Sequence, residues 1–301
     1  MSVDRADTAA RLLSERLRSG DRAVAILAHR ESATAAELEP EIRGWLVQRG
    51  VRVANDVAPA DLGLCLSLGG DGLMMRAARR YPDVPILGVN FGNFGFLTAA
   101  EAGEWREALN RLLAGDFHLR VGPTLATTLR RVESGRVEDL GWAVNDVVVH
   151  GEIRFVQPSL FIDGQHVNDY PGDGIILSTP AGSTAYCMAA GGPVLLSGVG
   201  GFAVVPISCH SPIRVSLIVP EDVEVGIRLE GRHGANLILD GESEQQRAIV
   251  PGDIVLMRKG PIAFRQVSFR SFDWFSAFQS KFNYQIRRAG RSPLAGSREL
   301  A

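Results

Sequence analysis

The residue with the clearest chemical potential is Asp71, which stands between glycines in the segment 69–72 (GGDG). The segment follows the continuous apolar run Leu62–Leu68 and precedes the helical pattern Leu73–Arg80, so it predicts a turn from a buried strand into a helix. Glycines let a ligand approach the backbone, and the start of a helix offers unpaired N–H groups suited to phosphate. In such a turn Asp71 could take the proton of an acceptor hydroxyl during phosphoryl transfer. For an isolated GGDG, an aspartate that only caps the helix is an equally good interpretation.

A second candidate site is the segment 169–194, in which hydroxyl groups, small residues and one aromatic ring stand together. Asp173 precedes the strand-like run Ile175–Ser178, and the segment 179–186 (TPAGSTAY) follows it. Hydroxyls and exposed backbone can bind the edge of a base while Tyr186 provides an apolar wall. Taken alone, this pattern slightly favours a polar loop between strands, with the tyrosine packed in the core.

Asn145 and Asp146 form a third candidate, because these two short polar residues interrupt the strand-like run 143–150 (AVNDVVVH). Such residues are unfavourable inside a strand unless they form a bulge or serve a site. The residues themselves support the two interpretations equally.

The first region that must position these residues has an alternating pattern. Apolar runs at Ala23–Leu27, Leu62–Leu68 and Val84–Val89 are separated by helical patterns such as Ala35–Gln48. Alternation of strands and helices at this spacing predicts parallel βαβ units. We therefore expect an α/β N-terminal domain, a parallel sheet with helices, over residues 1–115, which carries the GGDG turn.

The second region has a different pattern of residues. From Phe117 to Phe269, short β-type runs are separated by Gly, Asp and Pro, which predicts an all-β C-terminal domain, a layered sheet or sandwich, over residues 116–270. The helix-like run Trp274–Tyr284 lies in a last segment, residues 271–301. We expect this segment to return to the N-terminal domain and to end in a frayed tail.

Composition excludes several classes of protein. The 301 residues carry a net charge of −2, which provides no long-range field for nucleic acid or an anionic membrane. The N-terminus does not have the pattern of a secretory signal, and no apolar stretch is long enough to span a bilayer. Cys65, Cys187 and Cys209 form no close pair and are expected to be small buried residues, which favours a reducing cytoplasm. No His/Cys cluster has transition-metal spacing, so the sequence assigns no metal ligands.

Taken together, the candidate segments resemble the NAD kinase family. The matching segments are 69–72 (GGDG), 88–98 (GVNFGNFGFLT), 145–146 (ND) and 172–186 (GDGIILSTPAGSTAY), followed by the turn at 191–193 (GGP). They occur in the order in which the family has them. GGDG alone is not specific, since phosphofructokinases and lipid kinases carry similar turns, whereas the long TPAGSTAY segment is specific.

The resemblance implies an enzyme that transfers a phosphoryl group from ATP, or from polyphosphate, to the 2′-hydroxyl of the adenosine ribose of NAD, giving NADP. It implies that Asp71 accepts the proton of that hydroxyl and that residues 116–270 form the NAD-binding domain. The residues it assigns to the nucleotide site are Gly70, Gly72, Asn145, Asp146, Asp173, Thr184, Ala185, Tyr186 and Ala189. It places Arg154, Ser208, His210 and Glu242 near further pocket positions. For His210, a histidine without ligand contact is an equally good interpretation.

The resemblance also implies partners. NAD and ATP are the expected substrates, with a divalent metal, Mg²⁺, held mainly by phosphates and water. A homodimer or homotetramer is expected, with no nucleic acid and no membrane as a partner.

Three positions depart from the family's usual pattern. Leu73 stands where the family usually has threonine or another polar residue, which removes a hydroxyl that could contact phosphate. Ala189 replaces a frequent serine, and Glu242 replaces the more usual glutamine. Leu73 leaves donor preference open, and Leu73 and Ala189 keep one alternative in view, a catalytically weak NAD(P)-binding sensor. The glycine-rich turn keeps a second alternative, a lipid kinase built on the same turn.

Overall fold

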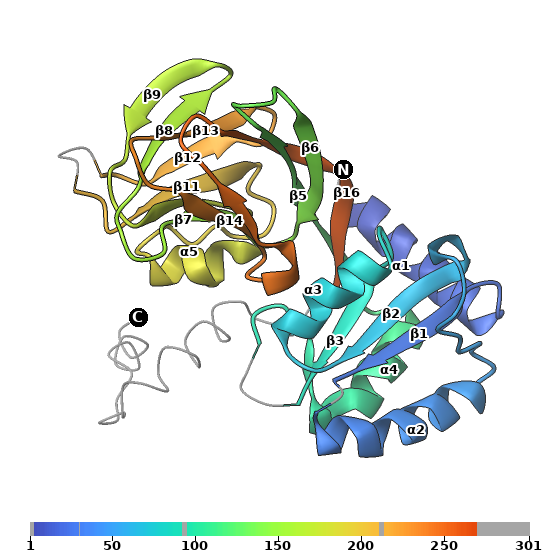
Figure 1. The fold of residues 1–301 in the computed structure, drawn as a ribbon. Coiled ribbons are helices and arrows are strands. Elements are labelled where there is room, and N and C mark those ends of the chain that lie inside the picture. Colours follow the sequence, from blue (N-terminus) through green and yellow to red (C-terminus); the bar gives the residue numbers. More distant parts are fainter. Residues whose placement is uncertain (1–2, 30, 92–94, 211–213, 270–301) are drawn as a thin grey trace, which may run out of the picture.

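The computed structural model describes residues 3–29, 31–91, 95–210 and 214–269. Its N-terminal part is a parallel sheet, β1-β2-β3, with helices on both faces (Figure 1). In chain order its elements are α1 (Val3–Arg18), β1 (Ala23–Ala28), α2 (Ala33–Val47), β2 (Leu62–Leu68), α3 (Asp71–Arg80), β3 (Ile86–Asn90), the short β4 (Ala100–Glu101) and α4 (Trp105–Ala114).

The apolar strand β2 is buried along its whole length because both of its faces are covered. Leu64, Leu66 and Leu68 share a core with residues of α1, α2 and α4. Cys65, on the other face, shares a core with Met74 and other residues of α3. Helix α3 therefore lies alone among these helices on its face of the sheet, and it begins at the carboxyl end of β2, as the glycine turn predicted.

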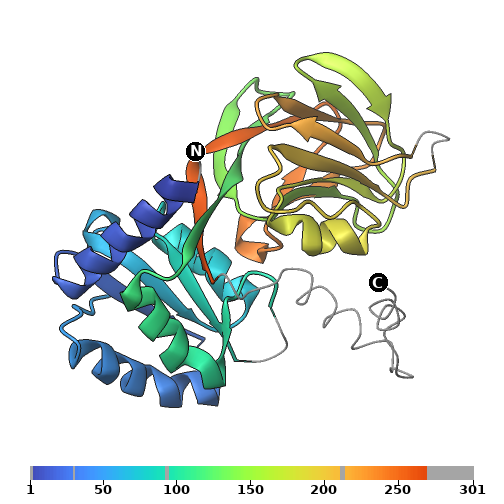
Figure 2. The same cartoon turned by 180° about the vertical axis from the view of Figure 1, so that it is seen from behind.

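Two long strands, β5 (His118–Arg130) and β16 (Ile254–Ser268), connect this sheet with the rest of the molecule (Figure 2). They pair with each other in antiparallel orientation, and Gln266 of β16 pairs in parallel with Ile86 of β3. A ten-stranded sheet thus continues from one part into the other. Seven of its strands follow one another in the order β1-β2-β3-β16-β13-β8-β9, where β13 is Val225–Glu230, β8 is Gln157–Ile162 and β9 is Gln165–Asp169. The other three lie off this path: β4 pairs with β3, β5 with β16, and β6 (Val137–Ala143) with β5. The chain returns to the N-terminal sheet within β16, whereas the predicted return through residues 271–301 lies outside the described residues.

The C-terminal part is a sandwich of two sheets. Its other strands are β6 (Val137–Ala143), β7 (Asp146–His150), β8 (Gln157–Ile162), β9 (Gln165–Asp169), β10 (Gly174–Ser178), β11 (Gly201–Ile207), β12 (Leu217–Pro220), β13 (Val225–Glu230), β14 (Ala235–Leu239) and β15 (Arg247–Ile249), with the one-turn helix α5 (Tyr186–Ala189). A six-stranded sheet has the order β12-β11-β10-β7-β14-β15. Side chains of both sheets, such as Leu177 of β10 and Ile227 of β13, form one core between them. The outer face of the six-stranded sheet packs on Cys187 of α5 and on Leu195.

The predicted fold class is confirmed: an α/β N-terminal part is followed by a β-rich part with sandwich packing. The domain limits at residues 115 and 270 stay predictions. All three cysteines are buried and none belongs to a disulfide, and burial raises the pKa of the Cys65 thiol to about 12. In the part of the chain that the structure describes, no helix has the length and apolarity needed to cross a membrane.

Candidate active site

Asp71 is the first residue of α3, directly after the N-cap residue Gly70. Its Oδ2 accepts a hydrogen bond from the backbone N–H of Phe96 at 2.9 Å, and its Oδ1 accepts one from Leu97 N–H at 3.0 Å. Among the described residues, the carboxylate is thus held by the loop that follows β3 rather than by the amides of its own helix. Two amide donors fix the plane of the carboxylate, and each oxygen keeps a further lone pair for another donor.

Asn145 and Asp146 stand where the chain crosses from one sheet to the other. Strand β6 ends at Ala143 in the ten-stranded sheet, and β7 begins at Asp146 in the six-stranded sheet. The two polar residues therefore do not interrupt one strand, and β7 pairs with β10 and with β14 in continuous register. Their location at a crossover explains the polar residues without a bulge.

The crossover is held on one side by the carboxylate of Asp240, which follows β14. Its Oδ2 accepts from Val144 N–H at 2.9 Å, and its Oδ1 accepts from Asn145 N–H at 2.6 Å and Asp146 N–H at 3.2 Å. The backbone N–H of Asp240 in turn donates to the carbonyl of Asp146 at 2.9 Å. Asp240 has a left-handed backbone conformation with φ 52°, which aspartate tolerates better than most residues.

The other side of the crossover is held by the TPAGSTAY segment. The hydroxyl of Thr179 donates to the carbonyl of Val144 at 2.6 Å, and Thr179 N–H donates to the carbonyl of Asn145 at 2.9 Å. Gly182 packs directly on the backbone of Asn145, where a Cβ atom would lie 2.5 Å from the Asn145 Cα. Every backbone amide and carbonyl from residue 144 to 146 thus has a partner, which makes this turn a rigid platform for the two side chains.

Asn145, Asp146, Ala185 and Tyr186 line a cavity of about 320 Å³. The side-chain Oδ1 of Asn145 is buried and lacks a hydrogen-bond partner among the described residues, so an acceptor is available there. Burial and the neighbouring charge of Asp240 raise the pKa of Asp146 to about 7. Tyr186 is 39% exposed, so it does not belong to the core. Partial burial and the charges of Asp173 and Asp146 raise its pKa, so the phenol stays neutral.

A second group of predicted residues lies at the opposite end of β7 and β10. Ser178 of β10 pairs with Asp146, whereas Gly174, next to Asp173, pairs with His150, so these two positions are about 13 Å apart along the strands. The cavity beside Tyr186 extends between them, since His150 also lines it. His210 N–H donates to the Pro171 carbonyl at 2.8 Å. The other members of this group are Arg154, which is exposed, and Ser208, which is exposed and has φ 46°.

The remaining predicted residues fall elsewhere. Ala189 is the exposed last residue of α5. Gly70, Gly72 and Glu242 line a cavity of about 320 Å³ at the start of α3, together with His29, Leu73, Met75, Arg76 and Asp240. Glu242 does not simply face solvent, because its Oε2 accepts from Arg79 Nη1 at 2.5 Å. The departure at Leu73 is a core contact, since this side chain is 7% exposed.

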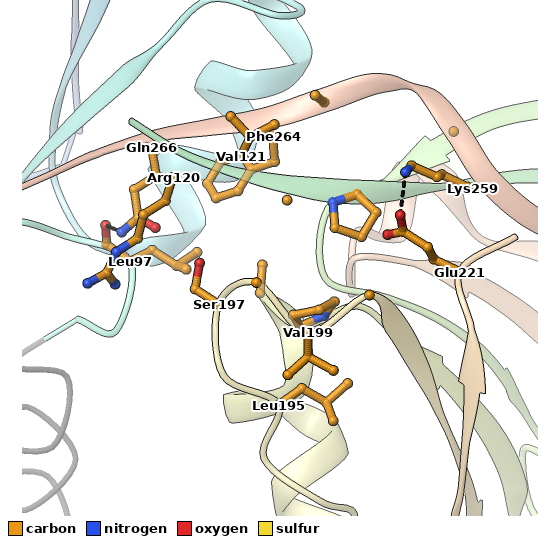
Figure 3. A pocket seen from close by; sticks show the side chains of 18 of the residues that line it. Leu97, Arg120, Val121, Leu195, Ser197, Val199, Glu221, Lys259, Phe264 and Gln266 are labelled. Atoms are coloured by element: carbon orange, nitrogen blue, oxygen red, sulfur yellow. Dashed lines mark hydrogen bonds and ion pairs between the residues drawn. The ribbon is translucent and has the colours of Figure 1, made fainter. Parts of the chain in front are cut away.

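A further cavity, of about 380 Å³, lies between strands β5 and β16 and the segment 195–200 (Figure 3). Phe96 and Leu97, whose amides bind Asp71, line it together with Thr184. Lys259 and Glu221 form an ion pair with an N···O distance of 2.5 Å. Figure 3 shows this pair at the side of the cavity opposite Leu97. The sequence did not predict this cavity, because its walls come from segments far apart in the chain.

Two family models match the chain. Residues 52–117 match the ATP-NAD kinase N-terminal domain and residues 145–269 match the ATP-NAD kinase C-terminal domain. The chain is 48% identical over 257 residues to the NAD kinase of Thermomicrobium roseum, covering 84% of this chain and 88% of that protein. The chain belongs to the NAD kinase family. The NAD kinase of Gemmatimonas aurantiaca is 33% identical over 244 residues, covering 79% and 82% of the two chains.

Solved structures of NAD kinases share the fold. The yeast NADH kinase complexed with NADH has a TM-score of 0.75 at 19% identity, covering 90% of each chain. An NAD kinase from Archaeoglobus fulgidus in complex with ATP has a TM-score of 0.69 at 23% identity, covering 86% of this chain and 98% of that one. The family, the fold class and the enzyme class predicted from the sequence, an NAD kinase, are therefore confirmed.

Sequence reasoning missed three residues that organise this NAD kinase site: Arg79, Thr179 and Asp240. The Asp-Gly pair at 240–241 is a signal for a tight turn with left-handed residues, and both have positive φ here. Thr179 lies within the recognised segment, but its role depends on strand pairing. Nothing in the local sequence distinguishes Arg79 from Arg80.

Proposed function

We propose that this NAD kinase phosphorylates the 2′-hydroxyl of the adenosine ribose of NAD, with Asp71 as the group that accepts the hydroxyl proton. The observation that carries the proposal is the anchoring of the Asp71 carboxylate by the amides of Phe96 and Leu97. A carboxylate held in one plane, with lone pairs still available, is suited to receive a proton from a positioned hydroxyl. Because the transition state of phosphoryl transfer is loose, this positioning matters more than the basicity of the carboxylate.

The dinucleotide would extend along the six-stranded sheet. The unpartnered Oδ1 of Asn145 is suited to accept a hydrogen bond from a ribose hydroxyl or a base amino group in the cavity beside Tyr186. The neutral phenol and ring of Tyr186 offer a wall for an aromatic base. A dinucleotide is long enough to reach the second group, which includes Asp173 and His210, about 13 Å along the strands.

We propose that the donor phosphates bind at the start of α3. Gly70 and Gly72 line a cavity there. Apart from its chain neighbours and the backbone of α3, no heavy atom of the described residues lies within 4 Å of the position that a Gly72 Cβ would occupy. A helix of this length directs unpaired N–H groups and its positive dipole end toward such a site. ATP is the proposed donor, with polyphosphate as the alternative.

A divalent ion would accompany those phosphates. No group of three or more His, Cys, Asp or Glu side chains that could hold a metal was found within the described ranges. The residues present fit Mg²⁺ held mainly by phosphates and water, since this ion keeps much of its hydration and needs few protein ligands. When bound, it would offset the negative charge of the transferred group.

The experiment incubates purified protein with NAD, Mg²⁺ and either ATP or polyphosphate, and follows NADP with an NADP-specific dehydrogenase. Asp71→Asn keeps the size of the side chain and is expected to lower kcat by about 100- to 10,000-fold while NAD still binds. Equal loss of NAD affinity and rate would contradict the role of Asp71 as base. NAD binding without NADP formation with either donor would favour a binding sensor, and Leu73→Thr would then be the first reversion. A homodimer or homotetramer and a cytoplasmic location stay predictions.

A further inference from the structure

Helix α3 carries Asp71 at its first residue and an unusual ion pair in its last turn. The guanidinium of Arg79 donates from Nη2 to Asp240 Oδ2 at 2.6 Å and from Nη1 to Glu242 Oε2 at 2.5 Å. Its side chain is 16% exposed, and the side chain of Asp240 is completely buried. The contact joins residues 161 positions apart in the chain. It also joins two separate sheets, because α3 packs on the parallel sheet and Asp240 follows β14 of the six-stranded sheet (Figure 1).

The partner of Arg79 is not an ordinary surface acid. The same Asp240 carboxylate accepts hydrogen bonds from the backbone amides of Val144, Asn145 and Asp146. One side chain therefore holds the platform for the proposed NAD-contacting residues and the helix that carries the proposed base. Four donors converge on one buried charge, so its position is strongly restricted.

The helix transmits this restriction over its length. Asp71 and Arg79 are eight positions apart, which corresponds to about 12 Å in an α-helix. A short helix is stiff on this scale, so holding its last turn against Asp240 limits the tilt and sliding of its first turn. At the other end of the helix, the Asp71 carboxylate is held by the loop after β3. Strand β3 is part of the parallel sheet on which α3 packs. Leu97 of that loop shares an apolar core with Met74 of α3 and with Val144. The ion pair of Arg79 adds a directional, charged contact to this non-directional apolar packing.

We infer that Arg79 and Asp240 are positioning residues for phosphoryl transfer, which align Asp71 on α3 with the Asn145–Asp146 platform across the two sheets. The inference rests on the proposed role of Asp71. Neither residue needs to touch a substrate for this role. The charge of Asp240 matters as much as its shape, because both of its oxygens must accept. An amide NH2 in place of Oδ2 would face both the guanidinium and the Val144 N–H, and in the flipped orientation it would face the Asn145 and Asp146 N–H groups.

The decisive experiment is a double-mutant cycle between Arg79→Met and Asp71→Asn, measured in the full-length protein with NAD, ATP and Mg²⁺. With Asp71 present, Arg79→Met is expected to lower kcat by more than about tenfold, with the KM for NAD within about threefold, because the platform keeps its own hydrogen bonds. With Asp71 replaced by Asn, the same change should lower kcat by less than about threefold. A residue that acts only on stability would have the same effect in both backgrounds.

Arg80→Met is the matched control. Arg80 is the next residue of the same helix, but its side chain is 53% exposed and its ion pair with Asp56 is 3.6 Å long. We expect this variant to keep the parent turnover. If Arg79→Met lowers the Tm so far that kinetics fail, Arg79→Lys keeps a positive charge beside Asp240 and takes its place in the cycle. It should retain more activity than Arg79→Met at a temperature at which both are folded.

The outcomes separate the inference from the proposed function. Asp71→Asn with full turnover would contradict both. Asp71→Asn with the expected loss, combined with equal effects of Arg79→Met in the two backgrounds, would contradict the positioning role alone. The positioning role is supported if the losses of kcat are non-additive, the KM for NAD stays within about threefold, and Arg80→Met keeps the parent turnover.

Discussion

The hydroxyl of Thr179 donates a hydrogen bond to the carbonyl of Val144 at 2.6 Å, in a part of the molecule where both residues are completely buried. The same oxygen accepts from Gly182 N–H at 3.1 Å. A single threonine thus connects the TPAGSTAY segment to the crossover that carries Asn145 and Asp146. Two of the three sequence motifs are therefore parts of one structure.

Thr179→Val keeps the shape of the side chain but removes both hydrogen bonds. We expect the free energy of unfolding to fall by about 1–3 kcal/mol, because a buried carbonyl and a buried amide lose their partner. The KM for NAD should rise as well, since the platform loosens. Thr124→Val is the control: Thr124 is also completely buried, and its hydroxyl donates to Ile262 O at 2.5 Å between β5 and β16. It should lose stability without a change in KM, and equal KM values in both variants would contradict the prediction.

Gly182→Ala tests how tightly the same segment packs on the platform. The new Cβ would overlap with the backbone oxygen of Asn145 and lie 2.5 Å from its Cα. Backbone atoms cannot move aside easily, so we expect at least about 2 kcal/mol of lost stability and weaker NAD binding. Gly103→Ala should change neither stability nor NAD binding, because, its local backbone and chain neighbours aside, no described atom lies within 4 Å of the added Cβ. Urea unfolding and calorimetric NAD titration measure both quantities, and a stable Gly182→Ala protein that binds NAD normally would show that the contact is not tight.

Gly95→Ala should lower turnover strongly and stability little, in contrast to Gly182→Ala. Its Cβ would overlap with Asp71 Oδ1 and lie 2.6 Å from Thr98 Oγ1. These are side-chain ends, so they can move at little expense of stability, but the carboxylate would leave its position between the Phe96 and Leu97 amides. We expect kcat to fall by about tenfold or more with a Tm close to that of the parent. Steady-state kinetics and thermal unfolding of the same preparation measure kcat and Tm. A kcat equal to that of the parent would mean that catalysis tolerates a displaced carboxylate.

Asp146→Asn should stabilise the protein in a pH-dependent way. Burial, and then the charge of Asp240, raise the pKa of Asp146 from 3.8 to about 7 in the folded state. A raised pKa means that the folded state disfavours the ionised form, so this carboxyl costs stability progressively as the pH rises from about 4 to about 7, and by a constant amount above that. The variant has no such charge. Its advantage in urea unfolding should therefore be larger at pH 8 than at pH 5, and an advantage independent of pH would show that Asp146 titrates normally.

The sequence by itself determined the local frame of the site. The apolar run Leu62–Leu68, the glycine turn and the helix after it are visible in neighbouring residues, because strand and helix periodicity depend on the chain nearby. Burial of β2 on both faces follows from the same local pattern, whereas α3 begins at Asp71, two residues before the predicted start at Leu73. The TPAGSTAY segment indicated the family, and this resemblance favoured a role in the site for Asp71, Asn145 and Asp146 over the structural alternatives.

Only the tertiary structure decided which atoms these residues meet. The partners of the Asp71 carboxylate are amides 25 and 26 residues away, and the amide partners of Asp240 lie 94 to 96 residues away. Arg79 and Arg80 are alike in sequence, yet one reaches a buried carboxylate across two sheets and the other a surface acid. Such contacts arise from strand order and register, which depend on how distant segments pair and pack. The reacting group could therefore be predicted from the chain, whereas the residues that align it became visible only in the fold.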